Sequence, residues 1–339
     1  MNEIRTFLAS LAIGTAFASH TFAAACMTVT LTGTQGGPPI FKGQAGAGTL
    51  VKYGDDNDNC SAVALQFDAG RGTTQRLSQT GTPVGKLNAV FLTHMHSDHT
   101  EGLASMMQLR WHFNSTGPKI DFVCSMDAVS PAGHTLSCTK LAAHIGDAFI
   151  QSGEMAQRLA ENKARLPGGP ADLINVMTFP PSPEPRVVWS SGDVVVSVIT
   201  SRHIPGHASY RVDTPAGSVV IGGDAGNDKA KPPRQSSTSA QVESLAQGAD
   251  IVVHSTIHPV MGPDGTSGFP PPIYYRQSTA TDLGALAQRA GVKHLMLTHL
   301  IPPPERLERG EEHYIEAVRR GGFEGELIVG NDLDHVSFG

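Results

Sequence analysis

The chain has 339 residues, 40% of them hydrophobic, and a formal net charge of −6. This composition supports a large core and excludes a membrane protein, because no segment beyond the N-terminus is long and apolar enough to span a bilayer. The acidic balance and the lack of a basic stripe argue against a protein that grips nucleic acid, which needs Lys or Arg to neutralise phosphates.

The N-terminus has the pattern of a secretory signal peptide. A polar start with Arg5 precedes an apolar run at 7–17, and small residues follow at 23–25. We expect residues 1–25 to be a signal peptide and the protein to be periplasmic or secreted. Two alternatives stay open: a buried first helix, and lipidation of Cys26, since the preceding alanines faintly resemble a lipoprotein cleavage box.

The remaining chain alternates between β-rich and helical patterns, and no linker is evident, so we expect one domain over 26–339. Strands are predicted at 27–31, 62–67, 89–92, 251–253, 295–297 and 326–329. Two hairpins are predicted at 187–200 and 209–222, each turning at a glycine. Helices are predicted at 103–112, 142–166, 239–246, 282–290 and 311–320, the second with weak points at Gly146 and Gly153.

One unit recurs in both halves of the chain. Apolar strands end in Thr-His at His94 and at His299, and apolar runs end in aspartate at Asp68 and at Asp224. Strand ends commonly hold chemical groups on a rigid scaffold. The repetition therefore predicts two packed sheets that present polar residues at one shared edge.

The four cysteines fit export, because disulfides persist in oxidising compartments. Of the three possible pairings we favour Cys26 with Cys60 and Cys124 with Cys138, since it closes short loops. Four buried thiols are the alternative.

The densest chemical pattern is His94-Met95-His96-Ser97-Asp98-His99. Imidazole and carboxylate are the ligands that zinc uses where a catalytic coordination position must stay open. On a tight loop after a strand, His94 and His96 can share one metal, while Asp98 and His99 face a second. A solvated polar loop is the alternative to this metal site.

This stretch resembles the H-x-H-x-D-H signature of the metallo-β-lactamase superfamily. Residues 67–76 resemble the first motif of its ribonuclease Z-like branch, and Gly223-Asp224, Val253-His254-Ser255-Thr256 and Leu297-Thr298-His299 resemble later motifs in the same order. The resemblance covers nearly the whole mature chain, and the subset most resembled is secreted and includes arylsulfatases. It implies an α/β fold, a four-layer αββα sandwich.

The resemblance also implies a metal site with two zinc ions. One zinc would be bound by His94, His96 and His203, the other by Asp98, His99 and His299, and Asp224 would bridge the two. The third ligand of the first site stays open between His203 and His207. We favour His203, because it lies seven residues before Tyr210 as in the family, although Ser209 stands where the family has glycine. His207 would then line the pocket.

For the mechanism we predict hydrolysis by a hydroxide that bridges the two zinc ions, because bound zinc lowers the pKa of water from 15.7 to about 7. The family uses the histidine at His254 as an acid or proton shuttle, so His254 would protonate the leaving group. A hydrogen-bonded core histidine is the alternative for it. Asp98 is the second candidate catalytic residue, for the proton of the water, and Asp68 would orient the ligand loops.

The substrate is predicted to be a small ester, with no nucleic acid as partner. The chain looks exported and acidic, and 20 residues separate His203 from Asp224, a gap in which tRNA-cutting members carry an extra arm. The secreted subset suggests aryl sulfate ester hydrolysis; a phosphodiesterase or lactonase of the same fold is the alternative. A non-catalytic periplasmic metal-binding protein would instead predict a missing ligand. We expect no stable membrane insertion after signal cleavage, and a homodimer is possible.

Overall fold

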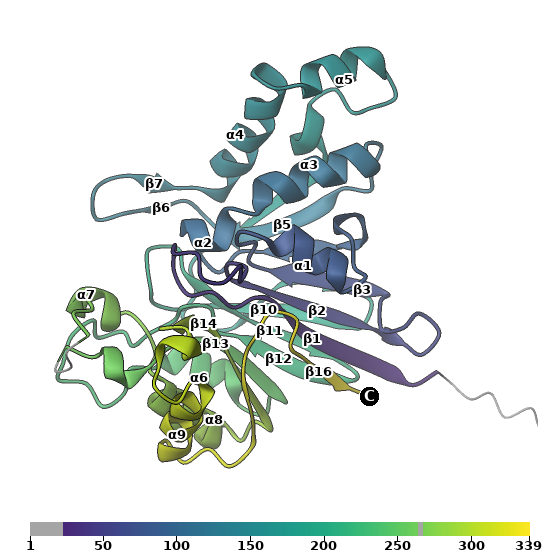
Figure 1. The fold of residues 1–339 in the computed structure, drawn as a ribbon. Coiled ribbons are helices and arrows are strands. Elements are labelled where there is room, and N and C mark those ends of the chain that lie inside the picture. Colours follow the sequence, from purple (N-terminus) through teal and green to yellow (C-terminus); the bar gives the residue numbers. More distant parts are fainter. Residues whose placement is uncertain (1–22, 264–266) are drawn as a thin grey trace, which may run out of the picture.

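The computed structural model describes residues 23–263 and 267–339 (Figure 1). The predicted signal peptide lies outside the described residues except for 23–25, and strand β1 begins at Ala25. Within the described ranges, no helix is both long and apolar enough to cross a membrane.

Two seven-stranded sheets carry the described part of the chain. The first sheet has the order β16 (His335–Phe338), β1 (Ala25–Gly33), β2 (Gly48–Asp55), β3 (Val63–Phe67), β4 (Ala89–Phe91), β5 (Ile120–Ser125), β8 (Ile174–Phe179). The second has the order β15 (Glu326–Val329), β14 (His294–Ile301), β13 (Ile251–Ile257), β12 (Gly217–Ile221), β11 (Ala208–Thr214), β10 (Val194–Thr200), β9 (Arg186–Ser191). In each sheet four neighbouring strands are parallel, β3-β4-β5-β8 and β12-β13-β14-β15.

Helices cover the outer faces of both sheets, which confirms the predicted four-layer αββα sandwich (Figure 1). The helices are α1 (Thr73–Gln79), α2 (Ser97–Thr100), α3 (Leu103–Phe113), α4 (Cys138–Gln151), α5 (Met155–Glu161), α6 (Ala240–Ala246), α7 (Pro271–Tyr274), α8 (Ala280–Ala290) and α9 (Glu311–Arg320). Side chains of α1, α3 and α4 pack on the first sheet, and those of α6, α8 and α9 on the second. The short hairpin of β6 (Ala128–Val129) and β7 (Thr135–Leu136) projects from the body, as do α4 and α5.

The core between the two sheets is built from alternate side chains of both. Phe67 of β3 stacks on Phe91 of β4, with ring centroids 4.7 Å apart, and Tyr210 of β11 packs against both rings. The hydroxyl of Tyr210 crosses the interface and donates a hydrogen bond of 2.6 Å to the carbonyl oxygen of Leu92, just beyond β4. This contact holds the loop after β4 against the second sheet.

One predicted helix, at 142–166, is wrong in its extent. The chain forms α4 and then α5, with a break at 152–154 that contains Gly153, the weak point predicted there. Gly146 does not interrupt α4, because its lack of a side chain serves packing: a Cβ at Gly146 would lie 2.8 Å from the Cβ of Ala171. Ser137 caps the start of α4 through its side chain.

The predicted disulfide pairing is confirmed. Cys26 at the start of β1 is bonded to Cys60 in the loop after β2, and Cys124 of β5 is bonded to Cys138 at the start of α4. The second bond ties the base of the projecting β6–β7 segment to the first sheet, because β6 and β7 lie between its two cysteines.

Candidate metal centre

The loop that carries the histidine motif follows β4 and is held by one buried aspartate. Asp68, just after β3, accepts hydrogen bonds of 2.8 Å from the backbone N–H of Thr93, from the Thr93 hydroxyl and from Nδ1 of His99. Its backbone has a positive φ of 55°, a conformation in which aspartate is enriched. Asp68 therefore orients the loop from behind, the role predicted for it.

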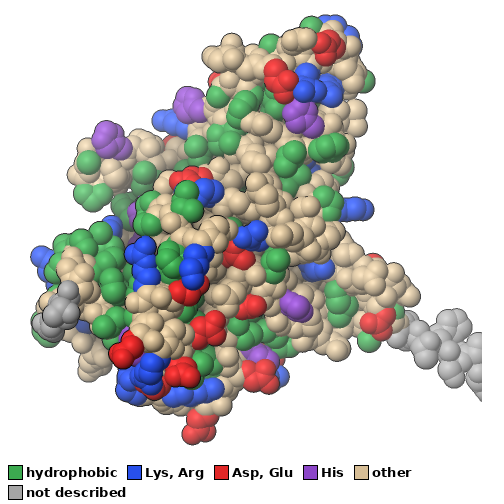
Figure 2. Space-filling view, in the orientation of Figure 1, with side chains coloured by type: hydrophobic (Ala, Val, Ile, Leu, Met, Phe, Trp, Pro, Cys, Tyr) green, Lys and Arg blue, Asp and Glu red, His purple; other side chains and the backbone are tan. Residues whose placement is uncertain are grey.

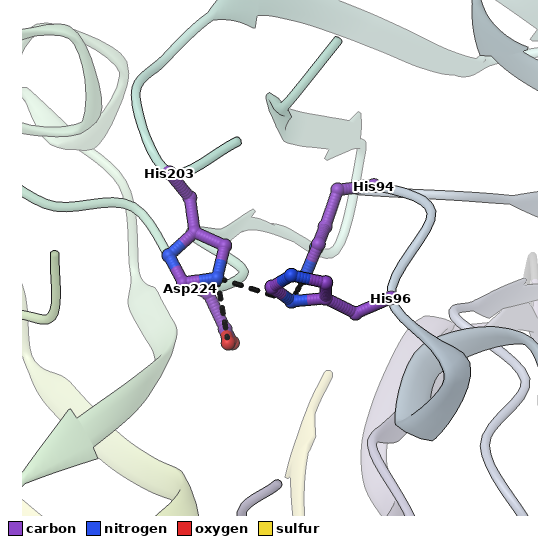
Figure 3. A group of neighbouring side chains, drawn as sticks. All are labelled: His94, His96, His203 and Asp224. Carbon is purple, nitrogen blue, oxygen red and sulfur yellow. Dashed lines mark hydrogen bonds and ion pairs between the residues drawn. The ribbon is translucent and has the colours of Figure 1, made fainter. Parts of the chain in front are cut away.

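A first group of side chains converges from three segments of the chain (Figure 3). His94 and His96 come from the loop after β4, His203 from the loop after β10, and Asp224 from the loop after β12. His96 Nδ1 lies 2.9 Å from His94 Nε2 and 3.3 Å from His203 Nε2, and His203 Nε2 lies 3.6 Å from Asp224 Oδ2. One ligand atom from each of the four lies within 4.8 Å of the others.

A second group of buried side chains adjoins the first. His299 Nε2 lies 3.0 Å from Asp98 Oδ2, and His99 Nε2 lies 3.7 Å from the same oxygen. The carboxylate of Asp224 touches this group too, because Oδ1 is 3.5 Å from His99 Nε2 and Oδ2 is 3.4 Å from His299 Nε2. Asp224 thus lies between the two groups, where a bridging ligand would lie.

His299 reaches this position through a β-bulge. In the pairing of β13 with β14, Ser255 opposes Thr298 and Thr256 opposes Leu300, so that His299 is the extra residue. Its positive φ of 47° accompanies the irregularity. A bulge re-aims a side chain at the rim of a sheet, and here it turns His299 toward the two carboxylates.

The structure separates His203 from His207. His207 is buried and uses both ring nitrogens: Nδ1 lies 2.8 Å from the hydroxyl of Ser201, and Nε2 accepts a hydrogen bond of 3.1 Å from the backbone N–H of Asp224. His203 has Nε2 in the cluster, while its Nδ1 faces the carbonyl oxygen of Arg276 at 3.4 Å. His203 therefore joins the candidate metal group, and His207 holds the Asp224 loop from outside it.

The side chains of the cluster fit divalent metal ions. Asp224 Oδ1 and His99 Nε2 are buried and have no hydrogen-bond partner within the described residues, which is costly unless another group is bound there. The second ring nitrogens of His94, His99 and His203 contact a hydroxyl, a carboxylate and a carbonyl oxygen, the outer contacts typical of metal-bound histidines. Five imidazoles and two carboxylates form the nitrogen and oxygen donor set that zinc takes in catalytic sites.

The electrostatics of the two groups differ. Burial lowers the pKa of His94 well below its ordinary value and that of His203 to about 4, so both rings are neutral at pH 7. For His99 the effect of burial is outweighed by the carboxylates of Asp224 and Asp68, which raise its pKa well above 6.5. Burial likewise opposes ionisation of Asp98, but its hydrogen bond to His299 and the charges of His99 and His299 lower its pKa to about 2.

His254, the predicted acid, lies apart from the open side of the cluster. Its side chain is fully buried, its Nδ1–H donates 2.6 Å to the carbonyl oxygen of Ser255, and burial lowers its pKa to about 4. A Cβ at Gly222 would lie 2.1 Å from the His254 ring, so a glycine is required there. His254 is not among the residues that line the cavity, and its proton-transfer role stays a prediction.

The cluster opens into a cavity of about 530 Å³. His96, Asp98, His203, Asp224 and His299 belong to its lining. Its walls are mostly apolar, from residues such as Phe41, Ile301 and Pro302, and Arg276 and Arg306 add two cations. Figure 2 shows Lys and Arg side chains beside hydrophobic ones on the face that carries α7. No motif marked Arg276, Arg306 or the apolar wall in the sequence, since these residues meet only in the folded chain.

Comparisons with known proteins agree with this architecture. A family model described as "Anti-Pycsar protein Apyc1" matches residues 58–146, which contain the histidine motif. Ribonuclease Z of Mycobacterium bovis (strain BCG / Pasteur 1173P2) is 28% identical over 314 residues, which are 91% of this chain and 98% of that protein.

Solved structures show the same fold at low identity. The metallo-β-lactamase fold protein YhfI of Bacillus subtilis has a TM-score of 0.59 at 18% identity and covers 92% of this chain and 99% of its own. The short form of human tRNase Z has a TM-score of 0.58 at 16% identity and covers 91% and 98%. Likeness at this identity speaks for the fold, not for the substrate.

These relatives overturn one prediction, that nucleic acid is excluded as a partner. The curated relatives that match nine tenths of the chain are named ribonuclease Z, after an action on RNA. The net charge of −6 misled because it sums the whole surface, whereas Arg276 and Arg306 lie at the cavity itself. The arylsulfatase-like subset finds no support among the relatives. The chain has the metallo-β-lactamase fold of metal-dependent hydrolases, and it is similar to the ribonuclease Z branch over nine tenths of its length.

Proposed function

We propose that the chain hydrolyses phosphodiester bonds of RNA at a centre of two metal ions. The observation that carries the proposal is the convergence of five histidines and two aspartates, five of which line one cavity. The similarity of nearly the whole chain to proteins named ribonuclease Z supports RNA as the substrate class.

The proposed ligand sets are those predicted from the motifs. One ion would be bound by His94, His96 and His203, the other by Asp98, His99 and His299, with Asp224 on both. Two zinc ions bound there supply a water of lowered pKa as the nucleophile and stabilise negative charge on phosphate oxygens.

The protein's own groups hold and tune this site. Asp68 accepts the Nδ1–H of His99 and so presents the Nε2 lone pair of that ring to the centre. His207 accepts the backbone N–H of Asp224 and fixes the loop that carries the bridging carboxylate. Asp98, whose pKa is about 2, is ionised at neutral pH and so available to bind metal, although the same low pKa makes it a weak proton acceptor. Arg276 adds a positive charge for a phosphate in the cavity.

An aryl sulfate, a phosphodiester and a lactone would all suit a two-metal clamp, so substrate choice needs a direct test. The zinc-loaded protein should be assayed with bis(4-nitrophenyl) phosphate, a short RNA, 4-nitrophenyl sulfate and a lactone under one condition. We expect cleavage of both diesters at rates well above those for the sulfate and the lactone. Sulfate or lactone hydrolysis without diester hydrolysis would overturn the proposal and leave the fold intact.

We also propose that the protein is exported. The signal-peptide pattern at 1–25 and the two disulfide bonds support an oxidising destination. Mass spectrometry of the protein from the native cell's periplasm or medium should give a chain that begins near residue 26. A full-length chain found with reduced cysteines in the cytoplasm would contradict it.

A further inference from the structure

A second hollow adjoins the first at the metal cluster. Its volume is about 710 Å³, and its lining shares His203 and Arg276 with the first cavity. Pro131, from the turn between β6 and β7, belongs to its lining, as does the loop 200–206 that carries His203. The two hollows therefore meet at the side chains where a scissile bond would lie.

Positive charge dominates this second hollow. Arg202 and Arg276 line it against one carboxylate, Asp228, which already accepts a hydrogen bond of 3.0 Å from Gln241. Neither guanidinium makes a hydrogen bond or ion pair with the rest of the described chain, and Nε of Arg276 is buried without a partner. An unpaired cation that is partly buried, as Arg276 is, is costly, so an anionic partner from outside the chain is expected beside it.

Arg276 lies at the junction of the two hollows. Its backbone carbonyl faces Nδ1 of His203 at 3.4 Å, and Arg276 lines the first cavity together with His96 and His203. A phosphate held at the cluster would thus lie within reach of this guanidinium. Arg202 precedes His203 in the chain and is exposed, on the side away from the first cavity.

We infer that the second hollow binds the part of an RNA strand that adjoins the scissile phosphodiester, with Arg276 on the phosphate at the junction and Arg202 on a neighbouring one. The inference rests on the proposed function and narrows it. A cyclic nucleotide or a small ester fills one hollow, whereas two hollows of similar size joined at the cluster suit a strand that passes through both. Guanidinium groups bind phosphate oxygens with charge-assisted hydrogen bonds.

The test compares Arg202→Ala with Arg320→Ala, a control that removes the same charge from an exposed position of α9, outside the lining of both hollows. For each zinc-loaded variant, kcat/KM is measured with an RNA oligonucleotide and with bis(4-nitrophenyl) phosphate. We expect Arg202→Ala to lower the ratio of the RNA value to the small-diester value about tenfold, the scale of one charge-assisted hydrogen bond. Arg320→Ala should leave that ratio unchanged.

Salt dependence gives a second readout that a merely structural change would not move. The slope of log(kcat/KM) for RNA against log salt should flatten by about 0.7 in Arg202→Ala, the value for each phosphate of a single strand that a cation neutralises. Equal ratios and slopes for Arg202→Ala and Arg320→Ala, with RNA still cleaved by the wild type, would overturn the inference alone. If the wild type cleaves neither RNA nor bis(4-nitrophenyl) phosphate, the proposed function itself is overturned.

Discussion

The two halves of the molecule supply the cluster in different ways. In the first half, four of the candidate ligands lie within six residues, on the loop after β4 and the short helix α2 that follows it, and Asp68 holds this segment. In the second half, His203, Asp224 and His299 come from three strand ends between residues 203 and 299, and one of them depends on a β-bulge. The first set is local in the sequence, whereas the second exists only once the second sheet has formed.

The two halves therefore need different structural features to position their ligands. The loop of the first half needs one buried carboxylate to orient it. The second half needs the spacing of β10, β12 and β14, together with supports such as His207 behind Asp224. Substitutions in the second half therefore distinguish most clearly between residues that bind metal and residues that position a metal ligand.

The largest effect is expected at Asp224, the residue that touches both groups. Asp224→Ala should lower kcat/KM for RNA by more than about 100-fold, the upper range for removal of an outer partner of a metal ligand. Asp193→Ala, in the exposed turn between β9 and β10, is the matched control. Activity of Asp224→Ala within tenfold of the control would remove its bridging role.

A smaller and more selective contrast is expected between His203 and His207. His203→Ala should lose about one metal ion per chain, because a candidate ligand is removed. His207→Ala should keep its metal and lose activity about 10- to 100-fold, since the Asp224 loop loses its support. Metal content by mass spectrometry decides, and the reverse pattern, with metal lost only from His207→Ala, would exchange the two roles.

The pH dependence of zinc binding should report the raised pKa values of the second group. The carboxylates hold protons on His99 and His299 in the metal-free protein, and a ligand imidazole must lose its proton. Zinc binding should thus release protons at pH 7, and affinity should rise with pH, by up to about tenfold per unit for each proton. Calorimetry in buffers of different ionisation enthalpy measures this. Proton uptake, or affinity that falls with pH, would contradict it.

The smallest effect concerns the hydrogen bond that joins the halves. Tyr210→Phe leaves the buried carbonyl oxygen of Leu92 without its hydrogen bond, which should lower the free energy of unfolding by about 1–3 kcal/mol. Urea unfolding of the metal-free protein measures it. An unchanged free energy of unfolding would contradict this prediction. A lower kcat/KM in variant protein that is fully folded would show that the bond also positions the loop after β4.

Local patterns predicted the parts of the structure that are local. The motif at 94–99, the hairpin turns at glycine, and helix α9 and strand β15 at their observed bounds all follow from short-range chemistry. His299 was also within reach, because the Thr-His ending repeats that of His94. Strands β2, β5, β8 and β16 escaped prediction. Glycines lie near both ends of β2, and the exposed Asn175 and Thr178 break the apolar run of β8.

Properties that arise from the folded surface could not be predicted. The sequence does not show that Arg276 and His96 line one cavity or that two hollows meet at His203. The mistaken exclusion of nucleic acid has the same origin, because a net charge does not tell where on the folded surface the positive side chains lie. The deep burial of His254 against Gly222 likewise depends on strand packing that no motif displays.

The metal content of the purified, unchelated protein tests the central claim most directly. If the two halves build one centre for two ions at their shared edge, inductively coupled plasma mass spectrometry should find close to two divalent metal ions per chain. Fewer than one metal ion per chain, in folded protein purified without a chelator, would contradict the account.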